Sequence, residues 1–314
     1  DVTVTGSTSI CAGTQAVLTA STTTVTNPVF TWYSDAALTN VVFTGAVFTA
    51  PGFTGTRTYY VTVKGSNKCE NTAATAKSVT IVVNDLPLNP VVATAGTNIC
   101  SGEATVLNLT NPQTGVTYEW YSAAVGGNLL YTGTSYTTAV LNASTDYYVV
   151  AIGAAGCNNN GGRVKVTVTV NPKPTVPTVT SASVSVCTGS AASLSVSNPQ
   201  TGVTYNWYTS LASGTIVGTG STFLTPAVNT NATYYVEATS GSCISTARTP
   251  VNVIPLPVPV APASATPANG ILCAGSTTTI TVNNPVAGLI YRWYAASSSG
   301  AVLAEGVSFT TPAL

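Results

Sequence analysis

Residues 111–121 read NPQTGVTYEWY, and close copies of this stretch occur at three other places in the chain. The copies are NPVFTWY (27–33), NPQTGVTYNWY (198–208) and NPVAGLIYRWY (284–294). They contain the only four tryptophans, Trp32, Trp120, Trp207 and Trp293, which lie 88, 87 and 86 residues apart. A spacing this regular predicts an array of one repeated domain.

The period divides the 314 residues into three full repeats and part of a fourth. We expect the boundaries at 1–84, 85–171, 172–255 and 256–314, the last repeat being incomplete. Proline-rich connectors, NDLPLNP (84–90), NPKPTVP (171–177) and IPLPVPVAP (254–262), lie between the repeats. Because proline favours an extended backbone, these connectors should be semi-rigid spacers. The sequence therefore predicts a rod of domains in which each repeat contacts mainly its neighbours.

Charged side chains are scarce: nine Lys or Arg balance nine Asp or Glu, and His is absent. This composition excludes the basic surface that nucleic acid or anionic lipid requires. No apolar run approaches the ~20 residues that cross a bilayer, so we expect no membrane insertion by these residues. With 56 Thr and 29 Ser, the chain is rich in residues suited to half-solvated strands, which favours an all-β protein. The chain also lacks Met and begins within a strand-like pattern, as expected of a mature or internal piece without its targeting signal.

Apolar residues alternate with polar ones in each repeat, which is typical of strands with one buried face. In the first repeat the pattern covers residues 16–20, 30–33, 59–63 and 79–83. The four tryptophans recur at a fixed distance from these positions, which predicts that they plug the core of each repeat. The residues that follow them, Tyr33, Tyr121, Tyr208 and Tyr294, point to the opposite side of the strand by alternation. These tyrosines are candidate surface contacts for a ligand, or else ordinary cross-strand packing.

Seven cysteines follow the same period. One precedes each tryptophan by 20 or 21 residues (Cys11, Cys100, Cys187, Cys273), and a second follows 56 to 58 residues later (Cys69, Cys157, Cys243). This spacing predicts a disulfide within each full repeat, joining Cys11 to Cys69, Cys100 to Cys157 and Cys187 to Cys243. Cys273 is left unpaired, either because its partner lies beyond residue 314 or because it is a free thiol. Disulfides would place the protein outside the cell or on its surface.

Metal binding is the competing reading of the cysteines, but no C-x-x-C pair and no His support it. The absence of His also excludes Ser-His and Cys-His nucleophiles. The acidic residues are scattered: the position of Glu119 is held by Thr31, Asn206 and Arg292 in the other repeats, as for a solvent-facing strand residue. The run NNNGG (158–162) approaches a calcium-binding composition, although a turn is the simpler reading. We therefore expect no catalytic site, no metal and no cofactor.

The order of motifs resembles a known family. In the first repeat CAG, AVLTA, TWY, TAP, YYV and Cys69 succeed one another, and in the third CTG, SLSVS, NWY, LTP, YYV and Cys243. This succession is similar to the immunoglobulin-like repeats found in tandem in large surface proteins of Bacteroidota, including adhesins of gliding bacteria. The resemblance covers the whole chain. It implies tandem immunoglobulin-like β-sandwiches in a fibrous, exported adhesin or stalk without catalytic activity.

The leading hypothesis is therefore a structural and adhesive stalk of a secreted bacterial surface adhesin or filament. Two alternatives are an array of glycan-binding modules and the accessory repeats of an extracellular hydrolase. Low charge together with abundant Val and Ala predicts that part of the surface is covered, by self-association into fibres or by surface glycans.

Overall fold

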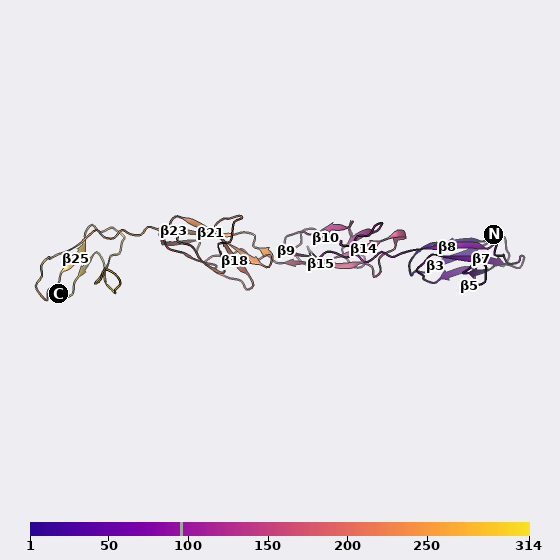
Figure 1. The fold of residues 1–314 in the computed structure, drawn as a ribbon, viewed down its shortest axis with the longest axis horizontal. Coiled ribbons are helices and arrows are strands. Elements are labelled where there is room, and N and C mark those ends of the chain that lie inside the picture. Colours follow the sequence, from indigo (N-terminus) through magenta and orange to yellow (C-terminus); the bar gives the residue numbers. More distant parts are fainter. Residues whose placement is uncertain (95–96) are drawn as a thin grey trace. The chain divides into compact units, whose positions relative to one another are not determined.

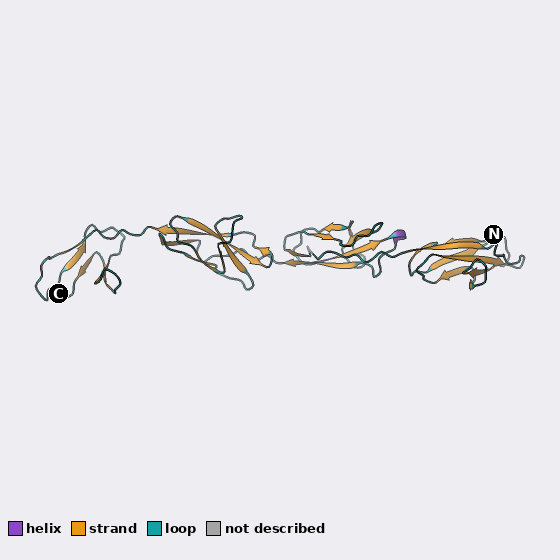
Figure 2. Ribbon diagram, in the orientation of Figure 1, coloured by secondary structure: helices purple, strands orange, loops and turns teal. Residues whose placement is uncertain are grey.

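The computed structural model describes residues 1–94 and 97–314. Two compact units make up the chain: residues 1–174 with 241–244, and residues 175–240 with 245–314. Strands dominate both units, and η1 (Ala154–Gly156) is the one short helical turn among the described residues (Figure 2). The prediction of an all-β fold built from tandem β-sandwiches is confirmed.

The first repeat is a sandwich of two sheets. The smaller sheet has the order β1-β3-β6 and the larger sheet β2-β8-β7-β4-β5. These strands are β1 (Thr3–Gly6), β2 (Ser9–Cys11), β3 (Ala16–Ser21), β4 (Val29–Tyr33), β5 (Val41–Thr44), β6 (Val47–Ala50), β7 (Arg57–Lys64) and β8 (Lys77–Asn84). β7 and β8 run side by side in the larger sheet (Figure 1). Leu18, Trp32 and Ile81 are fully buried between the sheets, as the alternation of apolar residues requires.

The second repeat repeats this plan in the same unit. Its larger sheet has the order β12-β11-β14-β15-β9, and β10 pairs with β13 opposite it. The strands are β9 (Asn98–Cys100), β10 (Val106–Asn108), β11 (Thr117–Tyr121), β12 (Leu129–Thr132), β13 (Ser135–Thr137), β14 (Thr145–Ile152) and β15 (Val164–Asn171). Leu107, Trp120 and Val149 are fully buried in its core.

The third repeat has a larger sheet of order β16-β23-β21-β18-β19, and β17 pairs with β20. The strands are β16 (Ser183–Cys187), β17 (Ser193–Ser195), β18 (Thr204–Tyr208), β19 (Gly218–Thr219), β20 (Thr222–Leu224), β21 (Ala232–Ser240), β22 (Cys243–Ile244) and β23 (Thr249–Leu256). Trp207 and Val236 are again fully buried.

The residues of the fourth repeat form two small sheets, β24-β25-β28 and β26-β27. Their strands are β24 (Ala265–Pro267), β25 (Thr279–Val282), β26 (Arg292–Tyr294), β27 (Val302–Glu305) and β28 (Ser308–Thr310). The strand that carries the Tyr pair in the full repeats has no counterpart in residues 256–314. Trp293 is accordingly only half-buried, whereas its three equivalents are inaccessible to solvent.

One strand pairing recurs in all three full repeats and positions the cysteines. β2 pairs with β8 in parallel, β9 with β15, and β16 with β23. In each case the first cysteine of the repeat lies opposite the end of the last strand: Cys11 opposite Asn84, Cys100 opposite Asn171 and Cys187 opposite Leu256. The first cysteine of a repeat therefore lies at the end where the chain leaves that repeat.

Candidate functional site

The cysteines pair differently from the sequence prediction. Bridges join Cys11 to Cys157 and Cys100 to Cys243, with Cα–Cα distances of 5.5 and 5.6 Å. Cys69 and Cys187, which we expected to be bonded, are free and exposed, as is Cys273. The predicted pairs Cys11–Cys69, Cys100–Cys157 and Cys187–Cys243 are therefore wrong. Each bridge instead joins the first cysteine of one repeat to the second cysteine of the next.

Strand direction explains the correction. Cys11 lies opposite Asn84, at the carboxyl end of β8. Cys69 follows β7, which is antiparallel to β8, so it lies beyond the end of the sheet where β8 begins at Lys77. The eight residues of β8 separate the two ends by roughly 24 Å. A disulfide tolerates a Cα–Cα distance of at most ~7 Å, so a bridge within the repeat is excluded by its own sheet.

The second cysteine of a repeat lies at the end where the chain enters it. Cys157 follows β14 and η1, and the amide of Gly153 donates to its carbonyl oxygen at 2.8 Å. A side chain at Gly153 would contact the ring of Pro87, a connector residue, at 3.3 Å. The exit end of the first repeat and the entry end of the second thus meet across a short connector, where Cys11 reaches Cys157.

Polar side chains of the second repeat hold the connector in place. Gln113 exchanges two hydrogen bonds with the backbone of Leu88: the Leu88 amide donates to Oε1 (3.1 Å), and Nε2 donates to the Leu88 carbonyl (3.2 Å). Asn111 accepts from the Val91 amide (2.8 Å) and donates to the Asn89 carbonyl (3.1 Å). Both residues belong to the NPQTG stretch, which therefore binds the connector in addition to starting β11.

The run NNNGG also contributes to this junction. Asn159 is 3% exposed; it accepts a hydrogen bond from the Ala151 amide and donates to the Gly162 carbonyl, which closes the run as a turn. Its side-chain amide also donates to Oδ1 of Asn89 in the connector, at 2.9 Å. No cluster of three or more His, Cys, Asp or Glu side chains suited to a metal ion occurs within residues 1–94 and 97–314.

The tyrosines that follow tryptophan are less accessible than alternation suggested. Tyr33 is 8% and Tyr208 7% exposed, Tyr121 is half-buried, and only Tyr294 is open, at 48%. The prediction of accessible surface contacts is therefore wrong for Tyr33 and Tyr208. These side chains do lie on the face of the sheet opposite the tryptophan, but other side chains cover that face.

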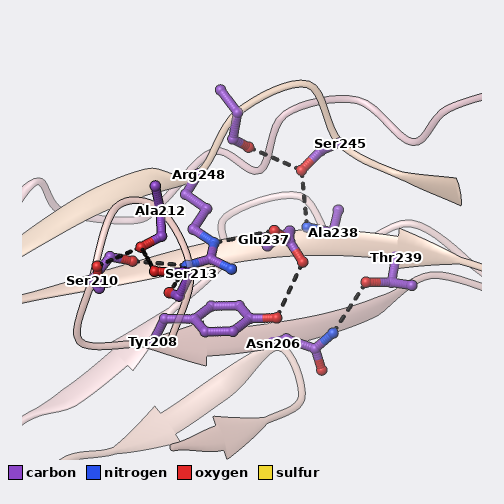
Figure 3. A network of polar contacts seen from close by, with 11 residues as sticks. Asn206, Tyr208, Ser210, Ala212, Ser213, Glu237, Ala238, Thr239, Ser245 and Arg248 are labelled. Atoms are coloured by element: carbon purple, nitrogen blue, oxygen red, sulfur yellow. Dashed lines mark hydrogen bonds and ion pairs between the residues drawn. The ribbon is translucent and has the colours of Figure 1, made fainter. Parts of the chain in front are cut away.

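Arg248 covers Tyr208 (Figure 3). Its guanidinium carbon lies 3.4 Å from the centre of the ring, and its Nε forms an ion pair with Oε2 of Glu237 at 3.1 Å. The Tyr208 hydroxyl donates to Oε1 of the same carboxylate at 3.2 Å. Burial, more than the neighbouring Glu237 carboxylate, raises the pKa of the Tyr208 phenol. The three side chains form a closed polar cluster on strands β18, β21 and the segment before β23.

The same arginine fixes the turn after β18. Its Nη1 donates to the carbonyl oxygens of Ser210 and Ser213 at 2.8 and 2.9 Å (Figure 3). In the second repeat, Arg163 lies 3.3 Å from the centre of the Tyr121 ring and donates to the Ala123 carbonyl at 2.7 Å. The cluster therefore serves to stabilise the sandwich, since its donors and acceptors are used within the repeat.

The tryptophans lie in the core. Trp32, Trp120 and Trp207 have no exposed surface, and each ring lies beside another aromatic ring, with centre-to-centre distances of 5.2 Å to Phe48, 5.8 Å to Tyr136 and 5.6 Å to Phe223. In all four repeats the indole Nε1 donates to the carbonyl of a glycine 13 residues later, at 2.9 to 3.0 Å. Sequence reasoning missed these glycines (Gly45, Gly133, Gly220 and Gly306), although their constant distance from each Trp is visible in the sequence.

No helix among the described residues has the length and hydrophobicity needed to cross a membrane. No curated protein matches the chain. Among solved structures, domains A168–A170 of titin share 12% identity over 81% of this chain and 98% of theirs, with a TM-score of 0.36. The fibronectin(III)-like modules of Clostridium thermocellum CbhA share 10% identity over 55% of this chain and 95% of theirs, with a TM-score of 0.35. At these TM-scores neither likeness carries an argument about this chain.

Comparison with protein families identifies the repeated domain. A model described as "Ig-like domain CHU_C associated" matches residues 1–84, 87–172, 174–257 and 259–314. These four matches coincide with the four Trp-centred repeats and together span nearly the whole chain. The chain therefore belongs to the CHU_C-associated family of immunoglobulin-like domains, which it carries in tandem.

Proposed function

We propose that the chain is a structural segment of a secreted bacterial surface adhesin or extracellular filament, and that it has no catalytic role. The observation that carries this proposal is the pairing of cysteines across repeats, because Cys11–Cys157 binds the first repeat covalently to the second and Cys100–Cys243 binds the second to the third. An enzyme or a binding module needs no such linkage between its domains. In a stalk that transmits force between its ends, covalent links between repeats would help to carry that force.

The state of the cysteines also supports a location outside the cytosol. Disulfides persist in oxidising compartments such as the cell surface and are rare where thiols are kept reduced. Tandem immunoglobulin-like repeats are common in extracellular proteins, so the family match supports the same location as the disulfides do.

The burial of two tyrosines weighs against the glycan-binding alternative. A carbohydrate platform needs aromatic faces open to solvent, whereas Tyr33 and Tyr208 are almost fully covered and Arg248 lies on the Tyr208 ring. The partners that we propose are surface glycans or other copies of the chain. They would contact exposed apolar side chains of the outer strands, such as Val41, Phe43 and Val47.

Small-angle scattering combined with a glycan array tests the stalk. A compact protein of 314 residues would have a radius of gyration of about 20 Å. We expect at least twice that value for the oxidised chain, a smaller value when residues 256–314 are removed, and no glycan bound. A radius near 20 Å, or binding of a defined glycan that Tyr294→Ala abolishes, would contradict the proposal.

Analytical ultracentrifugation of the oxidised chain tests whether copies of the chain associate with one another. Self-association should appear as a rise in the sedimentation coefficient with concentration. A monomer without glycans that stays soluble at high concentration would argue against a covered surface.

A further inference from the structure

We propose that the two bridges divert tension past most of the first and third repeats, so that the oxidised chain is a strain limiter that cannot be drawn out to its full length. This inference concerns the mechanics of the chain itself and does not depend on what the protein adheres to. It follows from which cysteines are joined and from where they lie on the strands.

The bridges close two large loops that overlap. Cys11 and Cys157 are 146 residues apart in sequence, and Cys100 and Cys243 are 143 residues apart. Residues 100–157 belong to both loops. Residues 12–99 and 158–242 each lie in one loop only and off the shortest covalent route between the ends. They can unfold, but their unfolding adds no length between the ends of the chain unless a bridge breaks.

The first repeat shows what the bridge changes. Without it, tension applied at Asp1 would be borne by strand pairing alone: first by β1, which pairs with β3, and at the connector by the parallel pairing of β2 with β8, which joins Ser9, Ile10 and Cys11 to Val82, Val83 and Asn84. Loss of these few hydrogen bonds would expose the repeat to unfolding by force. With the bridge, tension passes from Cys11 directly to Cys157 through covalent bonds. Residues 12–84 are then relieved of the tension between the ends of the chain.

The second repeat receives tension at Cys157, at its entry end, and passes it on at Cys100, at its exit end. The shortest covalent route through the oxidised chain consists of residues 1–11, 100–157 and 243–314. This route has about 140 residue steps and a contour length of about 480 Å at ~3.5 Å per residue, against about 1,100 Å for the chain without bridges. The bridges thus remove more than half of the available extension.

Three of the four bridging cysteines are buried. Cys157 has no exposed surface, Cys243 is 1% and Cys100 5% exposed, whereas Cys11 is half-buried. Thiol–disulfide exchange requires a thiolate to reach the bridge, so burial at the junction slows reduction while the repeats are folded. The limiter should therefore persist under mildly reducing conditions that act on exposed disulfides.

Single-molecule stretching of the 314-residue chain, held by peptide tags at both ends, tests the proposal. The three free cysteines are first replaced (Cys69→Ser, Cys187→Ser, Cys273→Ser), so that only the four bridging cysteines remain. We expect a final contour length of about 480 Å without reductant and about 1,100 Å after reduction. Adding Cys100→Ser and Cys243→Ser should give about 600 Å, because one loop is opened.

Two outcomes would overturn the proposal. Extension to about 1,100 Å without reductant would show that no bridge limits the chain. A length of about 900 Å would show that Cys100 and Cys157 are joined within the second repeat instead. Because the contour length depends only on which cysteines are bonded, a variant that folds less stably still gives a clear answer.

Discussion

Arg248 is the residue on which the third repeat depends most visibly outside its core. Its side chain and that of Glu237 are each only 11% exposed, and it lies on the ring of Tyr208. Removing one partner of a buried ion pair leaves an uncompensated charge, which costs about 3–5 kcal/mol. By contrast, the pair between Arg292 and Glu305 is more than half exposed on both sides, and because solvent screens such a pair it should contribute little to stability.

Arg248→Ala should therefore destabilise the third repeat far more than Arg292→Ala destabilises the fourth. The measurement is amide hydrogen exchange followed by mass spectrometry, read on β21 for the first variant and on β26 for the second. Protection of β21 should fall by a factor of at least 100, whereas β26 should change by less than a factor of ten. Equal effects of the two substitutions would contradict the assignment of a buried cluster.

At this scale the sequence predicts the side of a strand on which a residue lies, but not whether that side is covered. Trp207 and Tyr208 alternate as expected, and the tryptophan is buried. The cover over Tyr208 comes from Arg248, 40 residues later, and no local pattern links the two. In the first repeat the Tyr33 hydroxyl donates a hydrogen bond to Glu70, 37 residues later, at 3.1 Å.

Among the elements, the connector between the first two repeats is held by side chains as well as by its prolines. Gln113 satisfies both backbone groups of Leu88. Gln113→Ala should remove both hydrogen bonds, each contributing about 1 kcal/mol, and make the connector more mobile. Hydrogen exchange at the Leu88 amide should accelerate about tenfold or more.

Gln113→Glu is the matched control for this substitution. Glutamate keeps the acceptor for the Leu88 amide and loses only the donor, so exchange at Leu88 should stay closer to that of the unmodified chain. If the two variants exchange equally fast, the Leu88 amide is not protected by this side chain.

Strand positions were the most predictable elements, because alternation alone marks the buried face. Residues 79–83 lie in β8 with Ile81 fully buried, as their pattern indicates. The parallel pairing of β2 with β8 could not be predicted, since three residues beside a turn carry no mark of their partner or direction. That pairing places Cys11 at the exit end of the repeat. Because the pairing could not be predicted, the disulfide partner of Cys11 could not be predicted either.

For the whole molecule, repetition explains both what the sequence predicts and what it leaves open. Four tryptophans at a constant period predict the number and kind of domains, and the family matches agree with them. The same regularity makes two cysteine pairings equally periodic, one within each repeat and one between neighbours. Only the direction of the strands distinguishes them, because it places the two cysteines of a repeat at opposite ends of the sandwich.

Peptide mapping of the oxidised chain tests this pairing most directly. Free thiols are alkylated, the chain is unfolded without reductant at mildly acidic pH, where thiolates are scarce and exchange is slow, and it is then digested with trypsin. The bridges predict a single product that joins peptides 1–57, 78–163 and 166–248, with alkylated Cys69 in the separate peptide 69–77. Recovery of peptide 69–77 bonded to peptide 1–57 would show that Cys11 pairs with Cys69 within the first repeat, and would contradict the account.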